Sequence, residues 1–164
     1  MGKKILVLSD NHGSESELKT ILREFRGKFD LLVHCGDSTW SPEYLESLVT
    51  CPVYVAKGNC DVGFAGREEE VFDFEGHTCF VTHGHTYGVN WGTEQILEKA
   101  KEVGADLVFY GHTHVPDYSE YEEDEVIIMN PGSISQPRQM NPQRTFLMVE
   151  MQEDGRIHPQ FYMI

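Results

Sequence analysis

Seven side chains with oxygen or imidazole donors each follow a run of apolar residues: Asp10, His12, Asp37, Asn59, His83, His112 and His114. No lysine or arginine belongs to this set. Such polar groups pack closely only when a cation balances them. They are too many for one tetrahedral ion, whereas two ions that share a carboxylate would each receive about four protein ligands. The pattern therefore predicts a two-metal site of the kind that supports hydrolysis.

The apolar runs before these donors are typical of buried strands, and lie at 4–8, 30–37, 53–56, 78–82 and 107–110. Apolar residues at helical spacing predict helices over 15–26, 43–49 and 94–103. Alternating strands and helices indicate right-handed crossovers and parallel pairing. The carboxyl ends of parallel strands share one edge of a sheet, so we expect the seven donors to converge there.

The second half of the chain contains more strands than helices. After a loop predicted at 62–69, a hairpin turns at Gly76, and further strands are expected at 126–129, 145–151 and 157–163. An α/β first half and an all-strand tail predict two sheets packed face to face with helices outside. No linker or repeat divides the sequence, which predicts a single domain over residues 1–164.

Composition limits the classes of function. The 164 residues carry a net charge of −14, which argues against binding of long nucleic acid, because that requires Lys and Arg. A phosphate group handled by this chain should be small and should meet a local positive centre. The apolar run near the N-terminus is too short for a signal peptide or membrane span, so we expect a cytoplasmic protein without membrane contact. The four cysteines form no C-x-x-C pair and are expected to be buried thiols rather than disulfides.

Five short motifs follow the predicted strands in order: Asp10-Asn-His12, Gly36-Asp37, Gly58-Asn59, His83-Gly84 and Gly111-His-Thr-His114. Together they resemble the five-block signature of calcineurin-like metallophosphoesterases, and the chain is most similar to the small YfcE-like phosphodiesterase branch. The resemblance extends over essentially the whole chain. It implies an α/β fold, a four-layer αββα sandwich, with a dinuclear metal centre.

The resemblance also implies how the donors are shared. One ion would be held by Asp10, His12, Asp37 and His114. The other would be held by Asn59, His83, His112 and Asp37, with Asp37 as the bridge. Without thiolates among the ligands, manganese is favoured, with iron, zinc and nickel as alternatives. A water held between two cations would lose a proton and attack the phosphorus of a small phosphate diester in line.

One position departs from the pattern of many relatives, which carry histidine directly after Gly-Asn. Here that residue is Cys60. A thiol with an ordinary pKa of about 8.5 is a poor acid for protonating an alkoxide leaving group at neutral pH. We therefore predict better activity on aryl phosphodiesters, whose leaving groups need no proton, than on unactivated esters.

Several further positions near the motifs have more than one interpretation. Asp61 could orient Cys60 or an incoming substrate, or it could be an ordinary turn aspartate. His85 could contact the substrate or face solvent. His34 is expected to pack or to orient a ligand rather than bind metal. The turn at 130–133 could buttress the site or be a plain turn.

Two other functions remain open. A eukaryotic scaffold subunit of endosomal sorting coats also resembles this chain but has lost part of the histidine set, whereas this chain retains all seven donors. A nuclease acting on long DNA is disfavoured by the charge and by Cys60. The sequence leaves open whether the chain forms a homo-oligomer.

Overall fold

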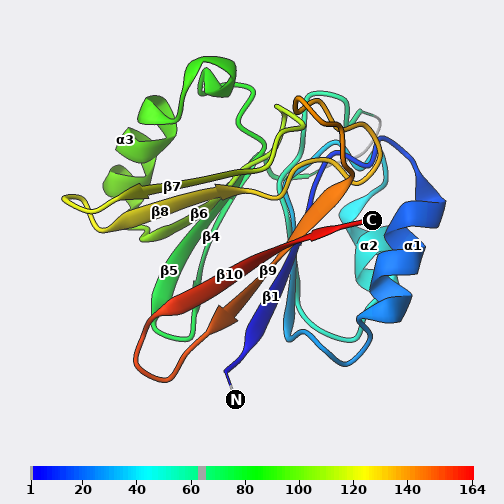
Figure 1. The fold of residues 1–164 in the computed structure, drawn as a ribbon, viewed down its shortest axis with the longest axis horizontal. Helices are drawn as coiled ribbons and strands as arrows, with labels where there is room; N and C mark the ends of the chain where they lie inside the picture. The colour runs from blue at the N-terminus through cyan, green and yellow to red at the C-terminus, as the bar shows by residue number, and fades with distance from the viewer. Residues whose placement is uncertain (1, 63–65) are drawn as a thin grey trace.

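Two five-stranded sheets form the centre of the computed structural model, which describes residues 2–62 and 66–164 (Figure 1). The first sheet has the strand order β10 (Ile157–Met163), β9 (Thr145–Met151), β1 (Lys4–Leu8), β2 (Leu31–His34) and β3 (Val53–Val55). The second has the order β4 (Glu69–Phe74), β5 (His77–Thr82), β6 (Leu107–Phe109), β8 (Val126–Asn130) and β7 (Asp117–Tyr121).

Helices cover the outer face of each sheet. On the first sheet lie α1 (Glu15–Glu24) and α2 (Pro42–Ser47), and on the second lies α3 (Glu94–Val103), which follows the short 3-10 helix η1 (Val89–Trp91) (Figure 1). The predicted four-layer αββα sandwich is therefore confirmed.

Strand β1 shows why this sequence requires four layers. Ile5 and Val7 pack into the core between the two sheets, whereas Leu6 and Leu8 pack into the core beneath α1 and α2. Both faces of the strand are buried, so every position in it is apolar after Lys4. Each buried aliphatic side chain contributes about 1.5–3 kcal/mol to folding.

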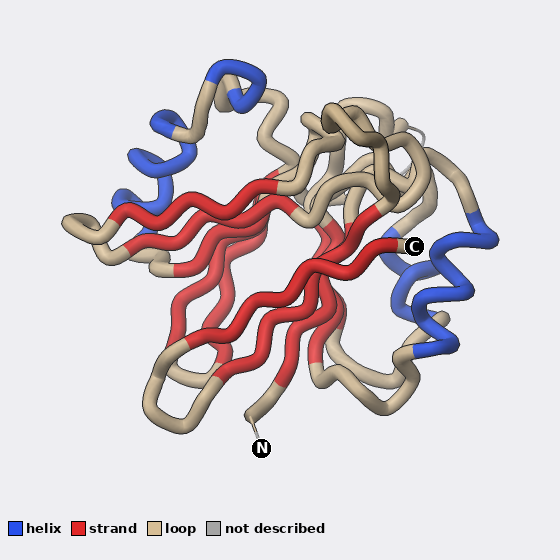
Figure 2. The backbone as a smooth tube through the Cα atoms, in the orientation of Figure 1, coloured by secondary structure: helices blue, strands red, loops and turns tan. Residues whose placement is uncertain are grey.

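The parallel strands run toward the same end of the molecule. In the first sheet β1 pairs in parallel with β2, and β2 with β3; in the second sheet β6 pairs in parallel with both β5 and β8. Loops gather at the carboxyl ends of these strands, while the N-terminus lies at the opposite end (Figure 2). This arrangement positions the segments that carry the predicted donors on one rim.

Some predicted boundaries differ from the structure. Strand β7 was not expected, because its sequence Asp-Tyr-Ser-Glu-Tyr is polar and it lies at the edge of its sheet. Helix α1 ends at Glu24, short of the predicted residue 26. Residues 63–65 of the predicted loop at 62–69 lie outside the described residues, and Glu69 already begins β4. Among the described residues, no helix combines the length and hydrophobicity needed to cross a membrane.

Candidate metal centre

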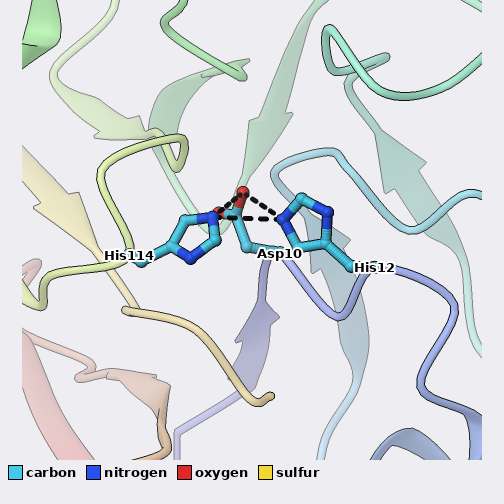
Figure 3. Close-up of side chains that lie close together, drawn as sticks. All are labelled: Asp10, His12 and His114. Atoms are coloured by element: carbon cyan, nitrogen blue, oxygen red, sulfur yellow. Dashed lines mark hydrogen bonds and ion pairs between the residues drawn. The ribbon is translucent and has the colours of Figure 1, made fainter. Parts of the chain in front are cut away.

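Six of the seven predicted donors meet at the rim in two groups. Asp10, His12 and His114 form one group, and Asp37, His83 and His112 form the other; within each group the potential ligand atoms lie within 4.8 Å of one another. Figure 3 shows how Asp10 and the two rings of the first group point toward a common space. The loops after β1, β2, β5 and β6 supply all six residues.

The surroundings of the Asp10 side chain favour a nearby positive charge. Its side chain is fully buried, and Oδ2 accepts hydrogen bonds from Ser9 Oγ at 2.5 Å and from the His112 amide at 3.0 Å. Its Oδ1 atom is buried, and among the described residues it has no hydrogen-bond partner. That oxygen lies 3.3 Å from His114 Nε2 and 3.7 Å from His12 Nε2. An unsatisfied buried carboxylate oxygen is costly, so this environment favours a cation.

Backbone carbonyls determine which ring nitrogens are free. His83 Nδ1 lies 2.7 Å from the Cys35 carbonyl oxygen, and His114 Nδ1 lies 2.6 Å from that of Gln136. A carbonyl only accepts, so Nδ1 donates in both rings. A neutral ring then presents the lone pair of Nε2 to the centre. Metal-binding histidines are usually oriented by a second hydrogen bond of this kind.

The ring nitrogens are crowded. His12 Nε2 lies 3.1 Å from His114 Nε2, and His112 Nδ1 lies 3.2 Å from His83 Nε2. Two neutral rings that both present lone pairs repel each other unless a proton or metal ion lies between them. The nearby Asp10 carboxylate raises the pKa of His12, so positive charge is favoured here.

Asp37 connects the two groups. Its Oδ2 lies 3.2 Å from His83 Nε2 and 3.7 Å from His12 Nε2, while Oδ1 accepts a hydrogen bond from the Cys60 amide at 2.8 Å. Burial opposes ionisation of Asp37, but its hydrogen bond with His83 holds its pKa below the usual value. Burial likewise disfavours the charged His83 ring, and the Asp37 carboxylate nevertheless raises the pKa of His83. Asp37 therefore lies close to histidines of both donor groups.

The backbone at the rim adopts an unusual conformation. Positive φ angles of 44° to 72° occur at five of the donors: Asp10, His12, Asp37, His112 and His114. Side chains disfavour this left-handed region, at a cost of about 1–3 kcal/mol per residue, and such strain concentrates at functional sites.

Two glycines allow the loops to approach the carboxylates closely. A Cβ atom at Gly58 would lie 2.2 Å from Asp37 Oδ1, and one at Gly111 would lie 2.7 Å from Asp10 Oδ2. Any side chain at these positions would displace the carboxylates from the centre. The glycines of the Gly-Asn and Gly-His-Thr-His motifs therefore have a steric role.

The sequence matches the calcineurin-like phosphoesterase superfamily domain over residues 4–154. The chain belongs to this superfamily. It is 38% identical to the probable metallophosphoesterase YsnB of Bacillus subtilis over 136 residues, which cover 82% of this chain and 76% of YsnB. It is 28% identical to the phosphodiesterase YfcE of Escherichia coli K12, with coverage of 85% and 83%. The predicted similarity to the YfcE-like branch is confirmed.

Solved structures show the same fold. A conserved protein of Streptococcus pneumoniae described as a predicted phosphoesterase superposes with a TM-score of 0.82 and 27% identity, covering 100% of this chain and 99% of that one. Vps29 of Entamoeba histolytica, solved in complex with Zn²⁺, gives a TM-score of 0.74 at 19% identity, with 98% of each chain covered. At that identity the likeness to Vps29 concerns the fold alone.

The Asp61 side chain is held by backbone hydrogen bonds that the sequence did not predict. Its buried carboxylate accepts hydrogen bonds from three backbone amides: Asp37 at 2.8 Å, Gly58 at 2.8 Å and Thr39 at 2.6 Å. The side chain thus joins the loops after β2 and β3. This supports a role in positioning Asp37. Among the described residues the Asp61 side chain makes no hydrogen bond to Cys60, and its predicted role toward an incoming substrate stays a prediction.

Asn59 and Cys60 lie at the exposed side of the phosphoesterase centre. The Asn59 side-chain nitrogen faces Cys60 Sγ at 3.8 Å; in the described part of the chain it makes no hydrogen bond to the other six donors. Cys60 is exposed, so the expectation of a buried thiol is wrong for this residue, although Cys35 and Cys79 are buried as expected. Partial desolvation and the Asp37 carboxylate raise the pKa of the Cys60 thiol. The Cys60 thiol is therefore a weak acid, and it is poorly suited to protonating an alkoxide leaving group.

His85 lies beside the second donor group. Its ring centroid is 5.4 Å from that of His83 and 6.2 Å from that of His112. Its Nδ1 atom is buried and has no hydrogen-bond partner in the part of the chain that the structure describes. Burial lowers the pKa of His85, which favours a neutral ring. This environment differs from that of a solvent-facing loop histidine.

The turn after β8 buttresses the first donor group. Ser133 Oγ donates to the Asp10 carbonyl at 2.7 Å, and Ser135 Oγ donates to the Asn11 carbonyl at 3.0 Å. Asn130 Nδ2 donates to the Gly111 carbonyl at 3.2 Å. The alternative of a plain turn at 130–133 is therefore wrong. Sequence reasoning did not identify Ser135, although its spacing of two residues from Ser133 was a usable signal.

His34 acts as a structural histidine. It is fully buried, its Nε2 lies 2.7 Å from Asn11 Oδ1, and its Nδ1 accepts a hydrogen bond from the Gly36 amide at 3.0 Å. Burial lowers its pKa to about 4, which keeps the ring neutral. As expected, His34 orients the loops that carry the donors and is not itself one of them.

Proposed function

We propose that this protein is a phosphodiesterase that hydrolyses small phosphate diesters at a centre of two divalent metal ions. The observation that carries the proposal is the buried, unpartnered Oδ1 of Asp10, which faces the Nε2 atoms of His12 and His114. The fit is good, because the donor set contains carboxylates and imidazoles whose free lone pairs converge. Manganese is our first choice of metal, with iron, zinc and nickel as alternatives.

We assign the donors as follows. Asp10, His12 and His114 would hold one ion, His83, His112 and Asn59 would hold the other, and Asp37 would be shared by both. The Asn59 side chain, which lies beside Cys60, would have to turn toward the other donors to do so. Two such ions supply Lewis-acid stabilisation of phosphoryl oxygens and lower the pKa of water.

The chain itself contributes rigidity and orientation to this chemistry. Asp61 fixes the Asp37 backbone, and the Cys35 and Gln136 carbonyls fix the rings of His83 and His114. Groups held in this way need little reorganisation when charge develops on the substrate. His85 lies next to the second donor group, where its neutral ring would contact the bound phosphate group.

The substrate should be small and should have a good leaving group. A surface of net charge −14 repels long nucleic acid, and the weakly acidic Cys60 is a poor proton donor for an alkoxide. Purified protein should be tested with manganese on bis(4-nitrophenyl) phosphate and on a dialkyl phosphate. We expect turnover of the aryl ester to be faster by at least about a hundredfold, the usual contribution of a general acid. Equal rates would contradict this role of Cys60.

The same preparation distinguishes the proposed enzyme from a binding scaffold. We expect close to two equivalents of metal per chain after loading with manganese, and loss of turnover after chelation. Protein that is folded but has no affinity for divalent metal would contradict the proposal and would favour the scaffold. We also propose the reducing cytoplasm as the compartment, because all four cysteines are free thiols.

A further inference from the structure

A third potential ligand group lies at the exposed edge of the centre. A ring nitrogen of His12, an Asp37 carboxylate oxygen and Cys60 Sγ all lie within 4.8 Å of one another. The three residues come from the loops after β1, β2 and β3. Two of them already belong to the proposed centre, so the sulfur adds a soft donor to a set of hard and borderline donors.

The backbone holds the sulfur in this place. The Cys60 amide donates to Asp37 Oδ1 at 2.8 Å, and the amide of Asp37 is in turn held by Asp61. The Asn59 side-chain amide lies 3.8 Å from Sγ. Cys60 therefore moves with Asp37 rather than independently of it.

A separate observation indicates that a cation belongs in this space. Asp10 is fully buried, and its Oδ1, which has no hydrogen-bond partner among the described residues, lies 3.7 Å from Nε2 of His12, the ring that also belongs to the Cys60 group. The other cysteines lack such surroundings. Cys35 and Cys79 lie in the apolar core, and Cys51 packs on the apolar cluster beneath α1 and α2. Packing thus explains those three cysteines and leaves the exposed Cys60 unexplained.

We propose that Cys60 is a metal-selective ligand of the centre. A thiophilic ion such as Zn²⁺, Cd²⁺ or Co²⁺, bound by His12 and Asp37, takes the Cys60 sulfur as an additional ligand, and the thiol proton passes to solvent. A hard ion such as Mn²⁺ leaves the thiol protonated and unbound. This inference rests on the proposed function, because it needs the metal centre.

The consequence is that the identity of the metal regulates access to the centre. Cys60 is exposed at the mouth, so a sulfur ligand there occupies a coordination position that a substrate phosphate would otherwise use. The protein with Mn²⁺ is then the more active form, and the protein with Zn²⁺ or Cd²⁺ has a lower turnover. Cys60 would thus reduce turnover when a thiophilic ion occupies the centre.

Cobalt spectroscopy tests the inference without reference to activity. Wild-type protein, Cys60→Ser and the control Cys51→Ser should each be titrated with Co²⁺. Visible d–d bands report that the ion is bound, and a near-ultraviolet sulfur-to-cobalt charge-transfer band reports the thiolate ligand. We expect both signals in the wild type and in Cys51→Ser, and only the d–d bands in Cys60→Ser.

Competition measurements extend the test to zinc. Loss of a ligand should weaken Zn²⁺ binding to Cys60→Ser by about 10- to 100-fold, with a smaller change for Mn²⁺. Wild-type protein that shows d–d bands without the charge-transfer band would overturn the inference and leave the metal centre intact. Absence of both signals would mean that the centre does not bind the ion, in which case the proposed function itself fails.

Discussion

Two ends of the same sandwich carry a histidine beside a carboxylate, and only one of them has the properties of a metal centre. At the end away from the rim, His77 Nδ1 lies 2.7 Å from Asp106 Oδ2, and its Nε2 lies 2.9 Å from the Gly155 carbonyl. At the rim, His83 also lies between a carbonyl and a carboxylate, those of Cys35 and Asp37. The immediate partners of the two rings are therefore alike.

The difference lies in the number of donors around each pair. The second oxygen of Asp106 accepts a hydrogen bond from the Thr78 amide at 2.9 Å, so every polar atom of that pair has a partner. At the rim, His112 Nδ1 approaches His83 Nε2 to 3.2 Å, and Asp10 Oδ1 has no hydrogen-bond partner. A histidine with a carboxylate is thus insufficient evidence for a metal site. An excess of converging donors is the distinguishing feature.

The largest expected difference is between two single variants, each of which removes one carboxylate, Asp37 at the rim or Asp106 at the opposite end. Asp37→Ala should lose metal binding and lower turnover by at least about a thousandfold, because loss of several kcal/mol of charge stabilisation costs a factor of ten per 1.36 kcal/mol. Asp106→Ala should keep metal and turnover, and lose about 1–3 kcal/mol of stability as His77 and the Thr78 amide become unpaired. Metal analysis, kinetics and thermal unfolding measure the contrast. Full activity of Asp37→Ala would refute the bridging assignment.

A smaller effect is expected from the residue that positions Asp37. Asp61→Ala frees the amides of Asp37, Thr39 and Gly58, so the bridging carboxylate loses its fixed backbone. We expect metal affinity to fall by about 10- to 100-fold, measured by isothermal titration calorimetry with Mn²⁺. The control is again Asp106→Ala, which has the same change in charge. Equal affinities of the two variants would show that Asp61 matters only for folding.

The smallest effect is a dependence of stability on pH that reverses with metal. In metal-free protein the Asp10 carboxylate raises the pKa of His12 above 6.5, so this ring binds its proton more tightly in the folded state. Its contribution to stability is complete below pH 6.5 and is lost as the pH rises through the raised pKa.

We therefore expect the Tm of metal-free protein to fall as the pH is raised from 6.5, at about 2–4 °C for each kcal/mol lost. With Mn²⁺ the Tm should rise over the same range, since metal binding requires neutral rings. Replacing His12 with Gln should flatten the metal-free profile. Parallel slopes with and without metal would contradict the view that protons and metal compete for these rings.

The sequence predicted the sandwich because its two signals were strong. Continuous apolar runs such as residues 4–8 identified the buried strands, and helical spacing identified the helices that cover them. Strand β7 was missed because its polar residues contribute little to the core. An edge strand such as β7 forms because it pairs with a neighbouring strand, and a single sequence contains little information about such pairing.

For the site, strand ends predicted the gathering of donors, and six of them do meet. Their role as metal ligands stays a prediction. Sequence alone could not reveal the hydrogen bonds of Asp61 to three backbone amides, or the carbonyls that orient His83 and His114. Those contacts join residues far apart in the chain through backbone atoms, which every residue possesses and no motif records.

The central claim is that the rim captures a pair of cations. Anomalous X-ray diffraction from crystals grown with Mn²⁺ tests it most directly. We expect two anomalous peaks separated by roughly 3.5–4 Å, one beside Asp10, His12 and His114 and the other beside His83 and His112, with Asp37 between them. A single peak, or no peak at the rim while the protein remains folded, would contradict the claim.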